Sequence, residues 1–215
     1  MDVVLGAHPS VFSHFLAEIR DQHIQQDSMR FRRNLERMGE VFAYEISKRL
    51  EYAPREVVTP LGVATEHGLV QQPVLVTILR AGLPMHQGLL NYFDQASNAF
   101  ISAYRKHHKD GTFDVQIEYL SSPDLKDREL ILCDPMLATG SSIVLAYRAL
   151  LTRGNPKHIH VVSAIASSEG VAYVKKNLPG NTTLWLGAID EELTAQSYIV
   201  PGLGDAGDLA YGTKL

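Results

Sequence analysis

The sequence predicts an α/β fold, with a mainly parallel sheet flanked by helices, on two observations. Short apolar runs of strand length recur along the chain, and helix-length segments with one apolar face lie between them. The predicted strands comprise residues 73–79, 99–104, 115–120, 130–133, 159–166 and 183–189. Strands that alternate with helices favour a parallel sheet covered on both faces, in which ligands bind beyond the carboxyl ends of the strands.

Length and composition are those of one globular domain. The chain has 215 residues, of which 45% are hydrophobic and 20% are charged, and this is enough for a substantial core. We expect a single domain, 1–215, with helices and a β-arm in 1–70, the core sheet in 71–190 and a functional loop in 191–215.

Charge and cysteine content limit the functional classes. A formal net charge of −4 argues against a broad nucleic-acid-binding surface. The single cysteine, Cys133, ends an apolar run and is expected to pack in the core, and a lone cysteine fits a reducing cytoplasm. We find no signal-peptide pattern and no apolar run of membrane-spanning length, so no membrane partner is predicted.

The N-terminal region is expected to contain two helices. Ser10 can cap a helix over 11–20, and Asp27 or Ser28 can cap a longer one. The first half of the longer helix carries four arginines, which are Arg30, Arg32, Arg33 and Arg37. A solvated helix face explains them most simply. Cations are nevertheless unfavourable at a helix N-terminus, which points to an anionic partner or to intersubunit pairs.

Two arms are expected in this region. Residues 1–9, before the first helix, are predicted to form an extended arm. Residues 55–65 are rich in β-branched side chains, and residues 66–68 can turn the chain. We therefore expect a hairpin or arm there, outside the main sheet.

The central segment joins a buried strand to a helix. Asp134 ends the strand, and a helical pattern begins near residue 143. The residues between them are Pro135, Met136, Leu137, Ala138, Thr139, Gly140, Ser141 and Ser142. Unpaired N–H groups and the helix dipole attract an anion at such a helix start, and three hydroxyl groups add donors, so the segment suits a phosphate monoester. The plainer explanation is a turn whose hydroxyl groups only cap the helix.

Two arginines follow other predicted strands. Arg80 opens an Arg-Ala-Gly turn in which Gly82 lets the backbone approach a ligand, and Arg105 ends the next strand. Because the carboxyl ends of parallel strands meet at one edge, we expect Arg80, Arg105 and Asp134 to lie together. The charged loop after Arg105 contains adjacent histidines but no cysteine or acid at ligand spacing, so no protein metal site is predicted.

A second distinctive segment, 198–208, contains Ile199, Gly204, Asp205 and Ala206. Its small residues around two acids predict neither a helix nor a packed strand. A flexible tail is one explanation, but the apolar residues at 198–200 and 203 favour an ordered loop. Exposed backbone N–H and C=O groups of such a loop can bind a small planar ligand.

Both segments resemble those of a known enzyme family. The run Asp134-Pro135-Met136-Leu137-Ala138-Thr139-Gly140 resembles the phosphoribosyl-pyrophosphate (PRPP) loop of type I phosphoribosyltransferases, in the form found in uracil phosphoribosyltransferases. Pro135 in place of a second acid is typical of the uracil enzymes, whereas Ser141 stands where a second glycine is common. Segment 198–208 resembles their uracil-binding loop, and the resemblance extends from about residue 30 to residue 214.

The resemblance implies a reaction in which uracil and PRPP give UMP and pyrophosphate. It implies that Asp134, Arg105 and Asp205 are catalytic. The uracil-binding residues it implies are Ile199, Gly204, Asp205 and Ala206. The PRPP-binding residues it implies are Arg80, Arg105, Asp134, Pro135, Met136, Leu137, Ala138, Thr139, Gly140, Ser141, Ser142 and Asp205. It further implies Mg²⁺ held mainly through the substrate pyrophosphate, a homodimer or larger assembly, and a GTP effector in some members.

Two other functions stay open at this point. A phosphoribosyltransferase-fold regulator that binds RNA of pyrimidine genes would need a basic surface, and only the arginines of residues 30–37 support one. A purine or orotate phosphoribosyltransferase would carry an acid pair at the central loop and lack the 204–206 loop. Binding of operon leader RNA tests the first alternative, and competition between bases tests the second.

Overall fold

The computed structural model describes residues 2–107 and 113–213, with residues 103–107 and 113–116 described in their backbone only. Its main sheet has the strand order β1-β10-β9-β7-β4-β5-β6, and the short strand β8 also pairs with β9. The strands are β1 Asp2–Val4, β4 Val74–Leu79, β5 Ser97–His107, β6 Phe113–Ser121, β7 Glu129–Cys133, β8 Met136–Leu137, β9 His158–Ser167 and β10 Thr182–Asp190. All pairings in this sheet are parallel except that of β5 with β6. The predicted fold class is therefore confirmed.

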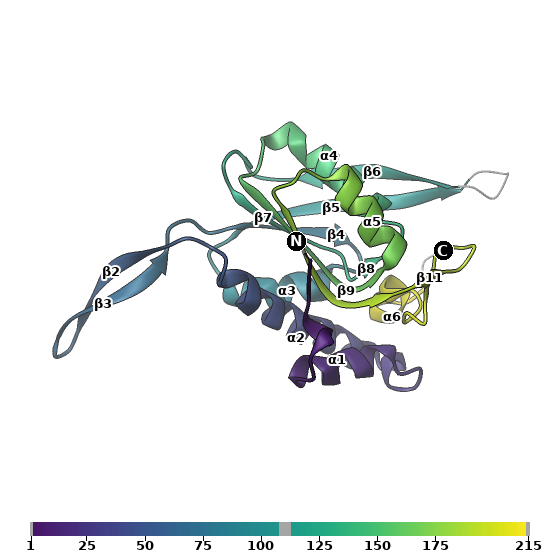
Figure 1. Cartoon of the computed structure of the whole chain (residues 1–215), viewed down its shortest axis with the longest axis horizontal. Helices are drawn as coiled ribbons and strands as arrows, with labels where there is room; N and C mark the ends of the chain where they lie inside the picture. The colour runs from purple at the N-terminus through teal and green to yellow at the C-terminus, as the bar shows by residue number, and fades with distance from the viewer. Residues whose placement is uncertain (1, 108–112, 214–215) are drawn as a thin grey trace.

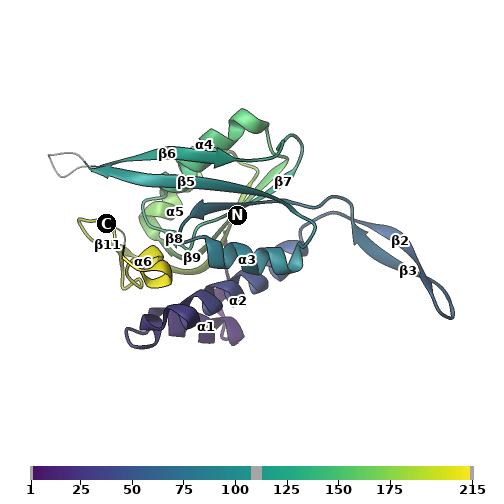
Figure 2. The ribbon, with the colours of Figure 1, turned by 180° about the vertical axis from the view of Figure 1, so that it is seen from behind.

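Helices cover both faces of the sheet (Figures 1 and 2). On one face lie α1 Val11–Arg20, α2 Ser28–Ser47 and α3 Leu83–Tyr92, and on the other lie α4 Ser141–Leu150 and α5 Ser168–Asn177. The short helix α6 Ala206–Tyr211 packs against α2. Single 3₁₀ turns occur at η1 Leu5–Ala7, η2 Ile24–Gln26 and η3 Leu151–Arg153. No helix in the described ranges is both long and apolar enough to span a membrane.

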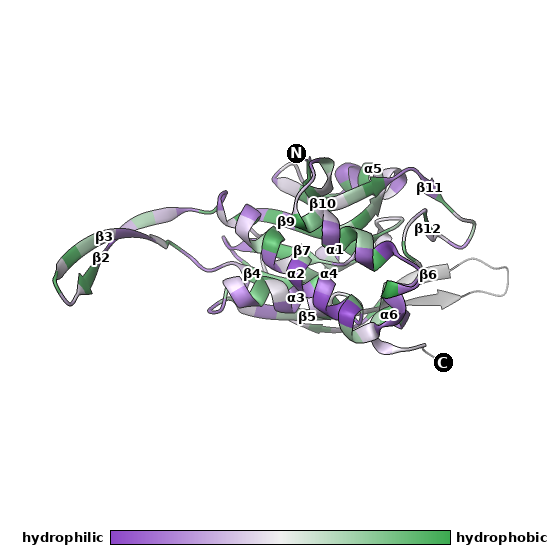
Figure 3. Ribbon diagram, turned by 90° about the horizontal axis from the view of Figure 1, so that it is seen from below, coloured by the Kyte–Doolittle hydropathy of each residue, from purple (hydrophilic) through white to green (hydrophobic). Residues whose placement is uncertain are grey.

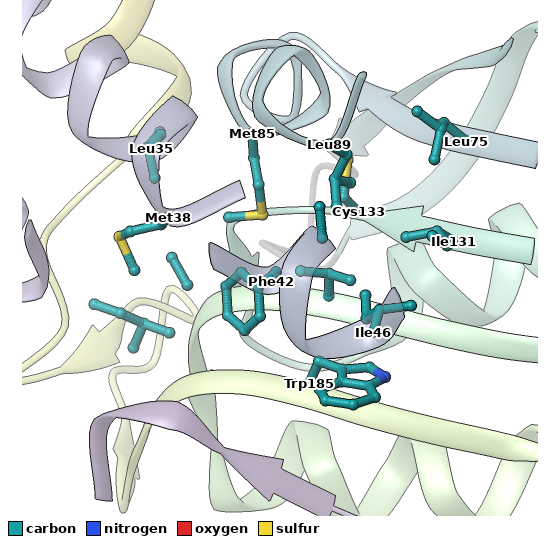
Figure 4. Packing of buried hydrophobic residues seen from close by; sticks show 14 of the residues in the cluster. Leu35, Met38, Phe42, Ile46, Leu75, Met85, Leu89, Ile131, Cys133 and Trp185 are labelled. Atoms are coloured by element: carbon teal, nitrogen blue, oxygen red, sulfur yellow. The ribbon is translucent and has the colours of Figure 1, made fainter. Parts of the chain in front are cut away.

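The core consists of two apolar layers because successive side chains of a strand point to opposite faces. Ile131 and Cys133 of β7 join the layer under α2 and α3, whereas Leu130 and Leu132 join the layer under α4 and α5. Figure 4 shows the first layer, in which Phe42 and Ile46 of α2 and Met85 and Leu89 of α3 surround Ile131, Cys133 and Trp185. The continuous apolar runs of the sequence follow from this two-sided burial.

Capping residues in the sequence correctly predicted where α1 and α2 begin. The Ser10 hydroxyl accepts from the Phe12 N–H, and a reciprocal capping box with Ser13 starts α1 where it was predicted. Of the two caps considered for α2, Asp27 is the one used, because its carboxylate accepts from the N–H groups of Met29 and Arg30. Helix α4 begins two residues earlier than the predicted residue 143.

A two-stranded hairpin, β2 Tyr52–Thr59 and β3 Gly62–Leu69, extends away from the sheet (Figures 1 and 3). The arm is confirmed, but its turn is not at residues 66–68, which lie within β3. The chain reverses at Pro60 and Leu61 instead, where proline fixes φ and the Thr59 hydroxyl accepts from the Leu61 N–H. A proline at the turn therefore outweighed the Glu-His-Gly signal.

Two further expectations were wrong. Residues 2–4 are extended, as predicted, but they form no arm, because β1 pairs in parallel with β10 at the edge of the sheet. Segment 198–208 contains regular structure, because β12 Ile199–Val200 pairs with β11 Glu192–Leu193 and α6 begins at Ala206. The Asp205 carboxylate accepts from the Asp208 N–H and thereby caps α6 despite the glycine at 207.

Candidate active site

The central acid, Asp134, is fixed at the carboxyl end of β7 by the neighbouring strand β9. Its N–H donates to the Val162 carbonyl (3.1 Å), and its carbonyl accepts from the Ser163 hydroxyl (2.6 Å). Its carboxylate lies 3.5 Å from the Met136 N–H, at the start of the following loop. The backbone at Asp134 is thus held rigidly while the carboxylate faces the loop.

Helix α4 starts directly behind this loop and has no side-chain cap. Gly140 precedes it with φ +76°, and a Cβ there would lie 2.9 Å from the Gly170 carbonyl oxygen. The Thr139 hydroxyl donates to the Ser141 hydroxyl (3.0 Å) and accepts from the Ser141 N–H (3.3 Å). Backbone N–H groups at an uncapped helix start bind anions, so the loop has the arrangement that a phosphate needs.

Ser141, the departure from the usual glycine, does not strain this turn. Among the described residues only Asp127 and Ser197 have positive φ without being glycine, and Ser141 is the first residue of α4. The left-handed position falls on Gly140 instead.

A second turn lies against the end of β7. A Cβ on Gly82 would lie 2.1 Å from the Thr77 hydroxyl and 3.1 Å from the Cys133 carbonyl oxygen, so only glycine permits this approach. The turn opens with Arg80, which a cis peptide bond joins to Leu79. Because β4 and β7 are neighbours in the sheet, Arg80 and Asp134 stand at adjacent strand ends.

The C-terminal segment reaches the same edge. Arg80 Nη2 donates to Asp208 Oδ1 (3.1 Å) and to the Gly212 carbonyl (3.3 Å). Leu203 and Ala206 belong to the apolar layer that contains Cys133, and Met136 and Ala138 of the central loop pack against that layer. The central loop after Asp134, the turn that begins at Arg80 and the segment 199–212 therefore converge on one edge of the sheet.

Comparison with known proteins agrees with this geometry. The family model described as "Uracil phosphoribosyltransferase" matches residues 6–213. The chain is 59% identical to a uracil phosphoribosyltransferase of Porphyromonas gingivalis over 100% of both chains. The chain belongs to the uracil phosphoribosyltransferase family.

Solved structures confirm the fold of this family member. The structure of the AQ2163 protein from Aquifex aeolicus superposes with a TM-score of 0.87 at 31% identity, over 100% of both chains. A hypoxanthine phosphoribosyltransferase from Staphylococcus aureus superposes with a TM-score of 0.50 at 15% identity, over 74% of each chain. That second likeness concerns the fold alone.

Ser167 and Gly170 pack against the central loop at the start of α5, and neither was predicted as part of the site. The Ser167 hydroxyl donates to the Ala138 carbonyl (2.5 Å) and accepts from the Gly170 N–H (2.8 Å). A Cβ on Gly170 would lie 2.3 Å from the Ala138 carbonyl oxygen. Ser167 also caps α5, but its bond to residue 138 crosses between elements and leaves no local signal in the sequence.

An ion pair between α1 and the end of β10 holds the segment that follows Ile199. Arg20 donates from Nη1 and Nη2 to the Asp190 carboxylate, both at 2.8 Å, and Nη1 also donates to the Gly202 carbonyl at 3.0 Å. The Gly202 N–H donates to Asp190 at 2.9 Å. Burial acts to raise the pKa of Asp190, but Arg20 and the Gly202 N–H outweigh it and bring that pKa below its usual value.

The four arginines at the start of α2 have partners within the chain. Arg32 donates to the Ala210 carbonyl (2.5 Å) and lies over the Tyr211 ring, so it holds α6. The others pair with neighbouring acids or amides: Arg30 with Glu18, Arg33 with Glu36, and Arg37 with Asn34. The cluster therefore has a structural explanation, which the sequence could not show because Glu18 and residue 210 lie in other elements.

Some predicted site residues are only partly described. Arg105 lies in β5, where its backbone pairs with Val115, but its side chain lies outside the described part. The second of the adjacent histidines, at 108, and residue 214, where the family resemblance ends, also lie outside the described residues. Ile199 is buried, and Gly204 has φ +96° with open space around it.

A cavity of about 420 Å³ lies beside the C-terminal segment. Gly204, Asp205 and Asp208 line it together with residues of the connection into α2. Within residues 2–107 and 113–213 no cluster of three or more histidine, cysteine or acidic side chains is arranged to hold a metal ion.

Proposed function

We propose that this protein transfers the phosphoribosyl group of PRPP to uracil and releases pyrophosphate, giving UMP. The observation that carries the proposal is the convergence of the Arg80 turn, the Asp134 loop and the Asp205 segment at the carboxyl edge of the sheet. An acid, a permanent cation and an uncapped helix start together match a sugar that bears phosphate and diphosphate groups. Family membership supplies the base, uracil.

The central loop is the proposed site for the 5′-phosphate. The N–H groups at the start of α4 and the hydroxyl groups of Thr139, Ser141 and Ser142 are its donors. The backbone of Pro135, Met136, Leu137 and Ala138 carries the chain from Asp134 to this site. The bond from Ser167 to the Ala138 carbonyl keeps the loop in place before the ligand arrives, which reduces the entropy lost on binding.

Asp134, Arg80 and Arg105 have separate proposed roles at the reacting carbon. Asp134 accepts from the ribose hydroxyl groups and stabilises the cationic ring that forms as the C1′–O bond breaks. Arg80 and Arg105 bind the departing pyrophosphate. Asp205 also contacts the phosphoribosyl substrate. Holding both substrates in line contributes much of the rate increase.

Magnesium fits this site as an ion carried by the substrate. The carboxylates of Asp134 and Asp205 are oxygen ligands of the kind that Mg²⁺ prefers, and the described residues offer no complete protein cage. When bound, Mg²⁺ neutralises charge on the diphosphate group. The protein's own part is to present these two carboxylates and Arg80.

Uracil is proposed to bind at Ile199 and the 204–206 turn. Its edge offers an acceptor, a donor and an acceptor, which backbone N–H and C=O groups can match without side chains. Cytosine places an amino group where uracil has a carbonyl oxygen, so a buried N–H donor would lose its acceptor. We therefore expect strong selection against cytosine.

Product formation tests the proposal directly. The protein is incubated with labelled uracil, PRPP and Mg²⁺, and UMP is separated by chromatography. We expect UMP with uracil, and no nucleotide with cytosine, orotate or hypoxanthine. Failure to form UMP from uracil, or equal use of hypoxanthine, contradicts the proposal.

A homodimer or larger assembly, a GTP effector and a cytoplasmic location remain proposals from the sequence. The hairpin β2–β3 supports the assembly, since Val58 is 85% exposed and Leu61 is 100% exposed. The GTP effector has less support, because the arginines of α2 have partners within the chain. Sedimentation and UMP formation with and without GTP test the first two.

A further inference from the structure

The contact between Arg80 and the C-terminal helix uses a single nitrogen of the guanidinium group. Nη2 donates to Asp208 Oδ1 at 3.1 Å and to the Gly212 carbonyl at 3.3 Å. Nη2 carries two hydrogens and can therefore donate one to each of these two acceptors. Nε and Nη1 meet no acceptor in the described part of the chain. The pair is half-exposed, with 40% of the Arg80 side chain and 30% of the Asp208 side chain accessible to solvent.

The engaged nitrogen is the one that an anion needs. A guanidinium binds a phosphate group most strongly with two parallel N–H groups. Its two such pairs are Nε with Nη2 and Nη1 with Nη2, so each pair includes Nη2. Bidentate hydrogen bonding to a diphosphate group therefore requires Nη2 to give up its hydrogen bond to Asp208, to Gly212 or to both.

We propose that Asp208 is a positioning residue that holds Arg80 against α6 before the substrate binds. Arg80 then exchanges its hydrogen bond to Asp208 for hydrogen bonds to the diphosphate group of the substrate. This rests on the function proposed above, in which Arg80 binds pyrophosphate. The Asp208 carboxylate weakens the binding of PRPP and of free pyrophosphate, because it must be displaced from Arg80 and because it repels a polyanion. Removal of its charge therefore strengthens diphosphate binding.

The backbone at Asp208 has a separate role. Its N–H donates to Asp205 Oδ1 (3.0 Å), and its carbonyl accepts from the Gly212 N–H (2.8 Å). Neither bond involves the Asp208 carboxylate. A change confined to that carboxylate therefore leaves the cap that Asp205, the residue proposed to bind uracil, forms on α6. The KM for PRPP should change while the KM for uracil stays close to that of the wild type.

Titration calorimetry with sodium pyrophosphate in Mg²⁺ buffer tests the proposal. We expect Asp208→Asn, which keeps the shape and the backbone bonds, to bind pyrophosphate about two- to fivefold more tightly, as for an exposed ion pair. The KM for PRPP should fall by a similar factor. Asp208→Glu keeps the charge and should behave as the wild type.

A matched control separates this effect from a general change in net charge. Asp94 is exposed and lies between α3 and β5, at the opposite edge of the sheet, so Asp94→Asn changes the charge equally without touching Arg80. Unchanged or weaker pyrophosphate binding by Asp208→Asn overturns the proposal, as does equal tightening by Asp94→Asn. A wild type that forms no UMP and binds no pyrophosphate refutes the proposed function itself, whereas UMP formation with unchanged pyrophosphate affinity in Asp208→Asn refutes only the role of Asp208.

Discussion

At the scale of single residues, the Cys133 thiol illustrates how burial controls reactivity. The side chain has no solvent exposure and lies 3.9 Å from the Gly82 carbonyl oxygen. Burial raises the pKa of this thiol to about 12, so almost none of it is thiolate at neutral pH. The packing role expected from the sequence is confirmed.

This burial predicts slow chemical modification. The native protein should resist iodoacetamide at pH 8, and labelling should become complete once urea unfolds the chain. Mass spectrometry of the labelled protein follows both states. Rapid labelling of Cys133 in the native protein would show that the turn after β4 opens readily.

Glu18 provides a pH-dependent contribution to stability. Its carboxylate accepts from Arg30 at 2.5 and 2.9 Å and from Asn34 at 2.6 Å. The hydrogen bonds from Arg30 and Asn34 lower the pKa of Glu18 from 4.5 to about 2. A carboxyl group with a lowered pKa stabilises the folded state above the pKa of the unfolded chain, and this stabilisation is lost as pH falls from about 4.5 towards 2.

We expect Glu18→Gln to lower the free energy of unfolding at pH 7. The difference from the wild type should persist down to about pH 4.5 and shrink at lower pH. Urea unfolding at a series of pH values measures it. Glu45→Gln, in an exposed pair with Lys48, is the control and should have little effect. A difference that does not depend on pH would exclude the ionised carboxylate as the cause.

At the scale of elements, helices α2 and α3 approach so closely that glycines are required between them. A Cβ on Gly88 would lie 2.0 Å from the Glu36 carbonyl oxygen, and one on Gly39 would lie 2.3 Å from that of Met85. Backbone cannot move aside as a flexible side chain does, so any larger residue must separate the helices.

Gly88→Ala should therefore lower the free energy of unfolding by about 1–3 kcal/mol. Gly180→Ala is the matched control, because a Cβ there meets no atom within 4 Å. Denaturant unfolding of both variants gives the comparison. Equal stability of the two variants would mean that the helices separate at little cost.

The ion pair between Arg20 and Asp190 should affect both stability and the nucleobase segment. Arg20→Met leaves Asp190, which is 8% exposed, without its charged partner, and we expect a loss on the order of 3 kcal/mol. Because Arg20 also holds the Gly202 carbonyl, the KM for uracil should rise more than the KM for PRPP. Steady-state kinetics with each substrate varied in turn distinguishes this from an equal rise in both.

The sequence predicted those elements whose signals are local. The cap at Asp27, the strand before Asp134 and the glycine before α4 could each be read from a few neighbouring residues. What it could not show depends on distant partners. Arg20 meets Asp190 across 170 positions, and Arg32 meets Ala210 across 178. Helix α6 was missed because Gly207 and its short length hide a helix that Asp205 and buried alanines stabilise.

At the scale of the whole molecule, the hairpin β2–β3 extends away from the sheet, and most of its side chains are exposed. A two-stranded hairpin is marginally stable alone, and its exposed apolar side chains favour a partner surface. A second copy of the chain is the partner that the proposed assembly supplies.

Leu61→Asp should therefore shift the sedimentation coefficient towards the monomer while the unfolding of the core is unchanged. Val11→Asp, which alters a side chain that is 63% exposed on α1, is the control and should leave the assembly intact. A wild type that sediments as a monomer, or a Leu61→Asp variant that sediments as the wild type does, would contradict this role for the hairpin.

The pairing of β1 with β10 also constrains how the protein is made. Residues 2–4 pair with residues 184–186, so the first strand has no partner in the sheet until residue 186 has been synthesised. Arg20 of α1 likewise has no ion-pair partner until Asp190 has been synthesised. The nascent chain must therefore carry β1 unpaired while the strands between it and β10 are made, and β1 can join the sheet only after β10 has been synthesised.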